Sequence, residues 1–177
     1  MHLFTVPGRN EVTANNQAIF DTLKKNYGLV PNLFAVLAYS DTALGDYLAF
    51  AGRKNSLTPQ EKETINLVVS QVNYCNYCLR GHTLAAKGAG FNDEQIIEIR
   101  KGAITFDNRL QALVQFAKET VLHKGRPAET IIDNFFEAGY TEENLIDALL
   151  TIVAKSFTNY LHNITQVPIE WPEIPEV

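Results

Sequence analysis

Residues 57–82 read LTPQEKETINLVVSQVNYCNYCLRGH, and their pattern predicts two successive helices. Thr58 is suited to cap a helix, Pro59 to open its first turn, and Glu61 to complete a capping box three residues after the cap. The apolar residues that follow recur with a period near 3.6, without the alternation of a strand. The stretch therefore predicts one helix from Pro59 to about Asn73 and a second helix that starts near the first cysteine.

The helical period extends over most of the chain, between clusters of Gly, Pro, Asn and Ser that interrupt it. We expect no strand. We predict an all-α fold, a single-domain helical bundle of eight to nine helices over residues 1–177. The expected helices lie near residues 14–26, 32–39, 41–53, 59–73, 75–89, 93–101, 107–124, 127–138 and 142–163.

The end of the chain, residues 166–177, is expected to be extended, because Pro168, Pro172 and Pro175 are incompatible with a helix. It carries Trp171, the only tryptophan of the chain. An extended apolar tail usually packs on something, and the sequence leaves open whether this is its own domain or a neighbouring subunit.

Composition excludes several classes of protein. The 177 residues are 46% hydrophobic and 20% charged, which excludes wholesale disorder, and a net charge of −5 does not fit a general nucleic-acid binder. No apolar run is long enough to span a membrane, and the first residues do not resemble a signal peptide, so we expect a cytoplasmic protein. No glycine-rich phosphate loop is present, so we expect no nucleotide or flavin cofactor.

Cys75 and Cys78 are the only cysteines. Residues three apart lie on one face of a helix, and the positive end of the helix dipole favours thiolate over thiol. In a reducing compartment such a pair indicates redox chemistry or a metal more often than a structural cross-link. His82 projects from the same face, four residues after Cys78, and can serve as the base that a nucleophilic cysteine needs.

Glu63 belongs to a polar stripe on the preceding helix. The other members of the stripe are Asn66, Ser70 and Asn73. If the stripe faces the cysteine helix, Glu63 can bind His82 and set its tautomer. Periodicity alone favours the other interpretation, a helix face exposed to solvent.

Two further interpretations concern metals and histidines. The Glu63, Cys75, Cys78 and His82 side chains could together bind zinc, but the chain has no second Cys-x-x-Cys and needs no metal to fold, so we expect no metal. The remaining histidines, which are His2, His123 and His162, are expected at the surface or at caps, with His162 as a candidate to line the site.

A weak internal repeat places Thr58 over Thr141 and Tyr74–Cys78 over Phe157–Leu161. None of the four candidate site residues recurs in the second copy. The repeat, if it is real, suggests a scaffold that occurs twice and chemistry that occurs once.

The motif Leu57–Pro59, Glu63, Cys75, Cys78 and His82 resembles the signature of the alkyl hydroperoxidase D-like proteins. These belong to the carboxymuconolactone decarboxylase superfamily, and the likeness is to its peroxidase-related branch, with the core motif in residues 57–90. The resemblance implies an all-helical fold, assembly into trimers or hexamers, and peroxide reduction by a cysteine pair that a Glu–His proton relay serves. It implies that these same four polar residues are catalytic.

The resemblance thus leads us to expect a thiol-dependent peroxidase that acts on a small-molecule hydroperoxide and is recycled by an external dithiol or protein reductant. The helix dipole favours Cys75 as the attacking sulfur. The resemblance and the proximity of His82 favour Cys78, with Cys75 resolving, and we prefer this assignment. Tyr77 stands where some members of the family carry a histidine. The alternative is a non-catalytic protein whose disulfide only senses oxidation.

Overall fold

The computed structural model describes residues 4–177, and every regular element in this range is helical. A single 3-10 turn, η1 (Arg9–Glu11), precedes α1 (Ala14–Tyr27), α2 (Asn32–Leu37), α3 (Ala43–Ala51), α4 (Pro59–Val72), α5 (Asn76–Gly88), α6 (Asp93–Lys101), α7 (Asn108–Leu122), α8 (Glu129–Glu137) and α9 (Glu142–Thr165). The all-α prediction is confirmed, and each predicted helix end lies within two residues of the observed one. Within the described range, no helix combines the length and the apolar character that a bilayer-spanning segment needs.

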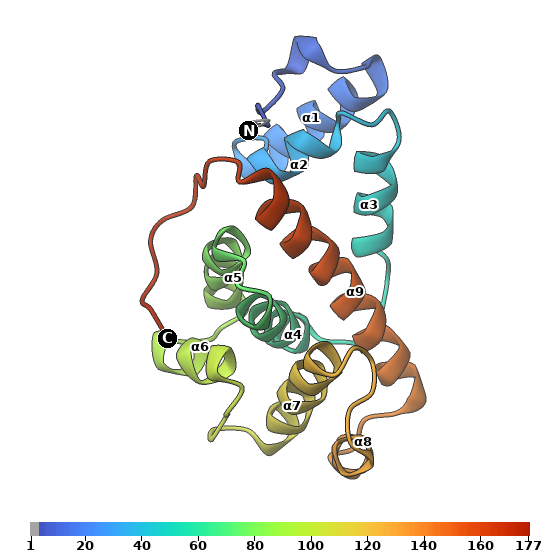
Figure 1. The fold of residues 1–177 in the computed structure, drawn as a ribbon, viewed down its shortest axis with the longest axis vertical. Helices are drawn as coiled ribbons and strands as arrows, with labels where there is room; N and C mark the ends of the chain where they lie inside the picture. The colour runs from blue at the N-terminus through green and yellow to red at the C-terminus, as the bar shows by residue number, and fades with distance from the viewer. Residues whose placement is uncertain (1–3) are drawn as a thin grey trace. The chain divides into compact units, whose positions relative to one another are not determined.

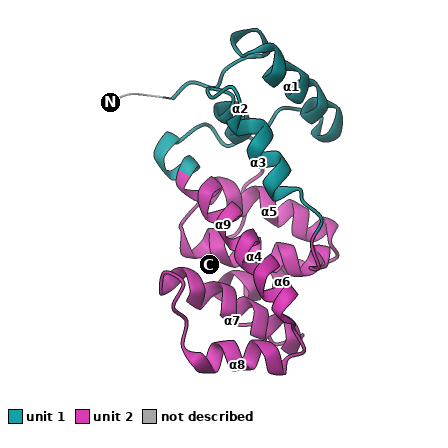
Figure 2. Cartoon of the chain, turned by 90° about the vertical axis from the view of Figure 1, so that its right-hand side faces the viewer, with its two compact units in different colours: residues 1–54, 161–170 teal, residues 55–160, 171–177 magenta. Residues whose placement is uncertain are grey.

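The chain forms two compact units (Figure 2). Unit 1 comprises Met1–Lys54 and Leu161–Glu170, and unit 2 comprises Asn55–Tyr160 and Trp171–Val177. The prediction that the whole chain is a single domain remains a prediction. All four candidate site residues belong to unit 2.

Helix α4 is the centre of unit 2, where it packs against α5, α6 and α7, while α8 packs against α7 (Figure 1). Ile65, Leu67, Val68 and Val69 of α4 are fully buried. Because these side chains point in several directions around the helix, α4 is enclosed on most of its circumference. A polar side chain in the middle of α4 that is buried in this way needs a hydrogen-bond partner in the protein.

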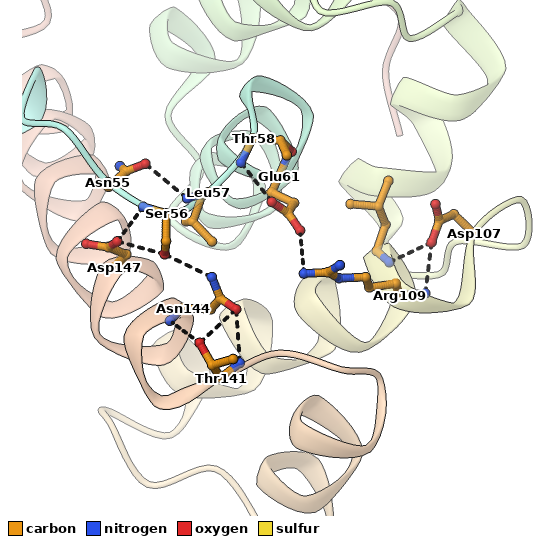
Figure 3. Close-up of polar contacts among 11 residues, drawn as sticks. Asn55, Ser56, Leu57, Thr58, Glu61, Asp107, Arg109, Thr141, Asn144 and Asp147 are labelled. Carbon is orange, nitrogen blue, oxygen red and sulfur yellow. Dashed lines mark hydrogen bonds and ion pairs between the residues drawn. The ribbon is translucent and has the colours of Figure 1, made fainter.

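The predicted capping box of α4 is confirmed, and α9 begins in the same way (Figure 3). The Thr58 hydroxyl accepts from the backbone N–H of Glu61 at 3.2 Å, and the Glu61 carboxylate accepts from the N–H of Thr58 at 2.8 Å. The Thr141 hydroxyl accepts from the N–H of Asn144 at 3.3 Å, and the Asn144 side chain accepts in return at 2.9 Å. The Asn144 amide also donates to the Ser56 hydroxyl at 2.9 Å, which joins the two helix starts.

The repeat fails at one point. Helix α4 ends at Val72, and the chain turns through Tyr74, whose φ of 54° lies in the left-handed region, before α5 begins. The corresponding residue of the second copy, Phe157, lies inside α9, which continues without a break to Thr165. The first copy therefore contains a helix start that the second copy lacks, and Cys75 lies there.

Unit 1 has a small core of its own. Phe20 and Leu23 of α1 pack with Leu44 of α3 in one hydrophobic cluster, and α2 also packs against α3. The buried Asn16 side chain donates to the carbonyl oxygens of Ala38 and Ser40, so its amide ties α1 to the turn after α2.

Candidate functional site

Cys75 caps the N-terminus of α5. Its Sγ accepts from the backbone N–H of Cys78 at 3.3 Å, and the two sulfurs are joined as a disulfide across a Cα–Cα distance of 5.3 Å. Both residues are buried, and no described cysteine is free. The predicted position at a helix start is confirmed, and the positive end of the helix dipole there favours a thiolate once the disulfide is reduced.

Glu63 binds His82 directly, because the polar stripe of α4 turns toward α5. The distance between Glu63 Oε2 and His82 Nδ1 is 2.7 Å, and the Asn66 amide donates to the other carboxylate oxygen at 3.1 Å. Burial raises the pKa of the Glu63 carboxyl, but the charges and hydrogen bonds of its neighbours outweigh burial and lower that pKa overall. Glu63 is therefore ionised at neutral pH.

The expectation that the polar stripe is exposed to solvent is wrong. The remaining members of the stripe bind Asn159 of α9: Asn73 donates to its side-chain oxygen at 3.0 Å, and its amide donates to the Ser70 hydroxyl at 3.1 Å. Asn159 is fully buried. The uninterrupted second copy of the repeat thus holds the chain at the point where the first copy breaks.

Lys155 is the site residue that the sequence analysis missed. It lies on α9, only 7% exposed, and its ammonium group contacts His82 Nε2. Burial lowers the pKa of Lys155 to about 8, against the opposing effect of the Glu63 carboxylate. Burial and, to a smaller extent, the charge of Lys155 lower the pKa of His82. The Glu63 carboxylate opposes this effect, but the pKa of His82 remains lowered overall.

A signal for Lys155 was present in the sequence. It is the only Lys, Arg, Asp or Glu between Asp147 and Glu170, in a stretch that is otherwise free of these charged residues. Charged residues are rarely buried unless they have a partner, so a lone cation in such a stretch indicates a buried contact. Its partner is 73 residues away in the chain, and no local pattern identifies it.

The other histidines do not join this cluster of side chains. His123 forms an exposed ion pair with Glu119 at 3.0 Å on α7, as expected for a surface residue. His162 is buried in unit 1, where its Nε2 contacts the Val167 carbonyl at 3.2 Å. His2 lies outside the described residues.

The end of the chain packs on unit 2 itself. The Trp171 ring meets the ring of Tyr77 edge-on with centroids 6.2 Å apart, and its carbonyl accepts from Arg80 at 3.4 Å. A Cβ at Gly81 would stand 3.2 Å from the indole nitrogen, so glycine allows the close approach. Of the two interpretations left open by the sequence, packing on its own chain is the one observed for Trp171.

The geometry does not favour zinc at this site. Glu63 occupies His82 Nδ1 and Lys155 occupies Nε2, so both ring nitrogens that could bind a metal are engaged. Among the described residues, no group of three or more His, Cys, Asp or Glu side chains is arranged to hold a metal ion.

Residues 38–119, which include the cysteine pair, Glu63 and His82, match the model of the carboxymuconolactone decarboxylase family. This segment of the chain is similar to that family. Lys155 lies outside the matched segment. No curated protein is significantly similar to the chain in sequence.

Solved structures share the fold at low sequence identity. A peroxidase-related protein from Silicibacter sp. TM1040 is 19% identical with a TM-score of 0.82, over 93% of this chain and 90% of its own. The alkylhydroperoxidase AhpD core protein from Ralstonia eutropha JMP134, also described as peroxidase-related, is 20% identical with a TM-score of 0.81, over 91% and 88%. The debrominase Bmp8 in complex with 2,3,4-tribromopyrrole is 16% identical with a TM-score of 0.79, over 96% and 92%.

Proposed function

We propose that the protein is a thiol-dependent peroxidase that reduces a small-molecule hydroperoxide through Cys75 and Cys78. The observation that carries this proposal is the disulfide at the start of α5, on the same helix as a histidine that Glu63 binds at 2.7 Å. A thiol pair with a helix dipole, a base and an orienting carboxylate has the parts that an activated cysteine requires. The match of residues 38–119 to the carboxymuconolactone decarboxylase family and the fold shared with peroxidase-related proteins support the same reaction class.

The cycle begins with the reduced pair. His82 accepts the proton of the Cys78 thiol, and the thiolate attacks the peroxide, so that an S–O bond forms and the O–O bond breaks. The departing alkoxide takes the proton from the imidazolium and leaves as alcohol. The Cys75 thiol then attacks the Cys78 sulfenic acid, which forms the disulfide and releases water. An external dithiol or protein reductant supplies the two electrons that restore both thiols.

Steady-state turnover tests the proposal. The reduced protein, supplied with excess dithiothreitol, should consume many equivalents of hydrogen peroxide or an organic hydroperoxide per chain, and Cys78→Ser should consume none. A sensor protein would consume one equivalent and stop, and that result would exclude the enzyme. A parallel reaction with 2,3,4-tribromopyrrole, the ligand of the debrominase of similar fold, tests whether the thiol pair acts on a halogenated ring instead.

We also propose that the protein acts in the cytoplasm as a homo-oligomer, a trimer or hexamer, without nucleic-acid or membrane partners. In unit 2, helix α9 exposes Ile146 (55%), Val153 (58%) and Tyr160 (54%). Their seven-residue spacing places them on one side of the helix, as in a seam that packs against another helix. A second copy of the chain is the partner that we propose for this surface.

A further inference from the structure

Glu63, His82 and Lys155 form one continuous chain of polar contacts through unit 2. The carboxylate meets Nδ1 of the imidazole and the ammonium meets Nε2, so the ring lies between an anion and a cation. The three residues come from α4, α5 and α9. Lys155 is itself more than nine-tenths buried, so its contact with His82 is not an incidental surface contact.

The contact with Lys155 determines where the protons lie. An ammonium group has donors and no acceptor, so Nε2 of His82 must accept from it with its lone pair. The single proton of the neutral imidazole is then on Nδ1, where it is donated to Glu63. In this state the Nε2 lone pair is not available to a cysteine thiol.

Building on the peroxidase function above, we propose that Lys155 is a positioning residue that acts as a proton gate on His82. While it is an ammonium, it fixes the neutral imidazole and occupies Nε2. Once it loses its proton to solvent, Nε2 becomes free to accept the proton of Cys78. No step consumes an oxidant or reductant beyond those of the peroxidase cycle.

The surroundings of Lys155 lower its pKa toward physiological pH, so that a fraction of the chains carries the neutral amine there. The charged or titratable groups that face it among the described residues are Glu63 from α4 and His82 from α5, and the cysteines of α5 do not titrate while they form a disulfide. In the disulfide form the pKa of Lys155 is about 8, so roughly one chain in ten has the free amine at pH 7. Opening the gate permanently should therefore speed thiol activation at pH 7 by up to about tenfold.

The test uses a protein in which Cys78 is the only thiol. Cys75→Ser prevents the disulfide, and serine is itself a good helix cap, so α5 should be retained. In this background, Lys155→Met removes the gate, Lys155→Arg keeps a permanent cation, and Lys101→Met changes an exposed lysine of α6 as the control. Two rates are measured from pH 6 to 10, alkylation by iodoacetamide and a single reaction with hydrogen peroxide, while nitrogen NMR reports the tautomer of His82.

With Lys155 in place, both rates should rise with a midpoint near pH 8, and His82 should carry its proton on Nδ1. Lys155→Met should react up to about tenfold faster at pH 7, so that only the smaller rise due to the Cys78 thiol itself remains, while Lys155→Arg should keep the tautomer and the slow reaction at pH 7. A rise and a rate at pH 7 that are unchanged in Lys155→Met overturn the proposal. So does a slower reaction at pH 7 with the midpoint moved upward, which means that the cation stabilises the thiolate instead.

Alkylation separates this inference from the peroxidase itself, because iodoacetamide reports the thiolate without any peroxide. If alkylation follows the expected pattern and no variant reacts with peroxides, the gate is supported and the peroxidase function fails. Circular dichroism and the His82 resonance identify a variant that has lost its fold, and Lys155→Arg then provides the second measure of the gate.

Discussion

Lys155 should make the oxidised protein more stable as the pH rises from 7 to 9.5. Burial lowers the pKa of this lysine from its ordinary 10.5 to about 8, so the unfolded chain binds the proton more tightly than the folded protein does. Stability rises with pH wherever the unfolded state binds more protons, which for this group is the range between about pH 8 and 10.5. The full effect is about 3 kcal/mol, of which about 2 kcal/mol falls between pH 7 and 9.5.

The other groups of the site act at lower pH. Burial and the charge of Lys155 lower the pKa of His82, so its stabilising effect is complete once the pH exceeds the ordinary histidine value of 6.5. The lowered pKa of Glu63 gives stability that is present above its ordinary pKa of 4.5 and is lost as the pH falls. Between pH 7 and 9.5, Lys155 is therefore the group of this cluster that titrates.

Urea unfolding of the disulfide form, at intervals of pH and without added thiol, measures the effect. Lys155→Met should abolish the rise of the free energy of unfolding with pH. At pH 7 this variant should be more stable than the parent by about 2 kcal/mol, because removing the buried charge gains about 3 kcal/mol and losing one hydrogen bond costs about 1 kcal/mol. In a chain of this size the gain corresponds to roughly 4–8 °C in Tm. Lys101→Met should retain the slope of the parent. A slope that survives in Lys155→Met, or a parent with no slope, would refute the reasoning.

Three further outcomes are expected. Cys75→Ser should react once with peroxide and hold a sulfenic acid on Cys78, which dimedone labelling and mass spectrometry detect. Cys78→Ser should not react with peroxide. Oxidation found only on Cys75 would reverse the roles of the two cysteines. Glu63→Gln should slow the first reaction with peroxide by about 100-fold or more in stopped-flow measurements, because general-base catalysis is lost. The variant should still form the disulfide when it is treated with diamide. An unchanged rate would show that Glu63 is not part of the relay. Sedimentation should show a trimer or hexamer at micromolar concentration that Val153→Glu dissociates, and a parent that sediments as a monomer would contradict the assembly.

The helices could be predicted because their signals are local. The Thr58 capping box and the change of pattern before Cys75 are read from a few adjacent residues, and both occur as predicted. The pairing of Glu63 with His82 could be stated only as a condition, since a period of 3.6 shows that polar residues share a face but not what that face meets. Here it meets α5 and α9, so the favoured interpretation of a solvent-exposed stripe was wrong.

Lys155 could not be assigned a role from the sequence, because its partner His82 lies on α5, which is distant from α9 in the chain. The same is true of Trp171. The prolines around it predict an extended segment, but they do not predict that its ring contacts Tyr77 of α5. Both residues act across long sequence separations. Long-range contacts of this kind are set by the tertiary fold and not by any local propensity.

The break between α4 and α5 has no counterpart in the second copy of the weak repeat. Two copies of a capped helix can have the same scaffold, but only the first copy turns at Tyr74 and begins a new helix. A new helix start provides free backbone N–H groups, and Cys75 occupies it, whereas the corresponding Thr158 lies inside α9 with its hydroxyl bonded to the Lys155 carbonyl. The uninterrupted copy provides Asn159, which binds Ser70 and Asn73 at the end of α4, and Lys155, which contacts His82. The first copy thus holds the cysteine pair at a helix start, and the second copy provides the side chains that bind the end of α4 and contact His82.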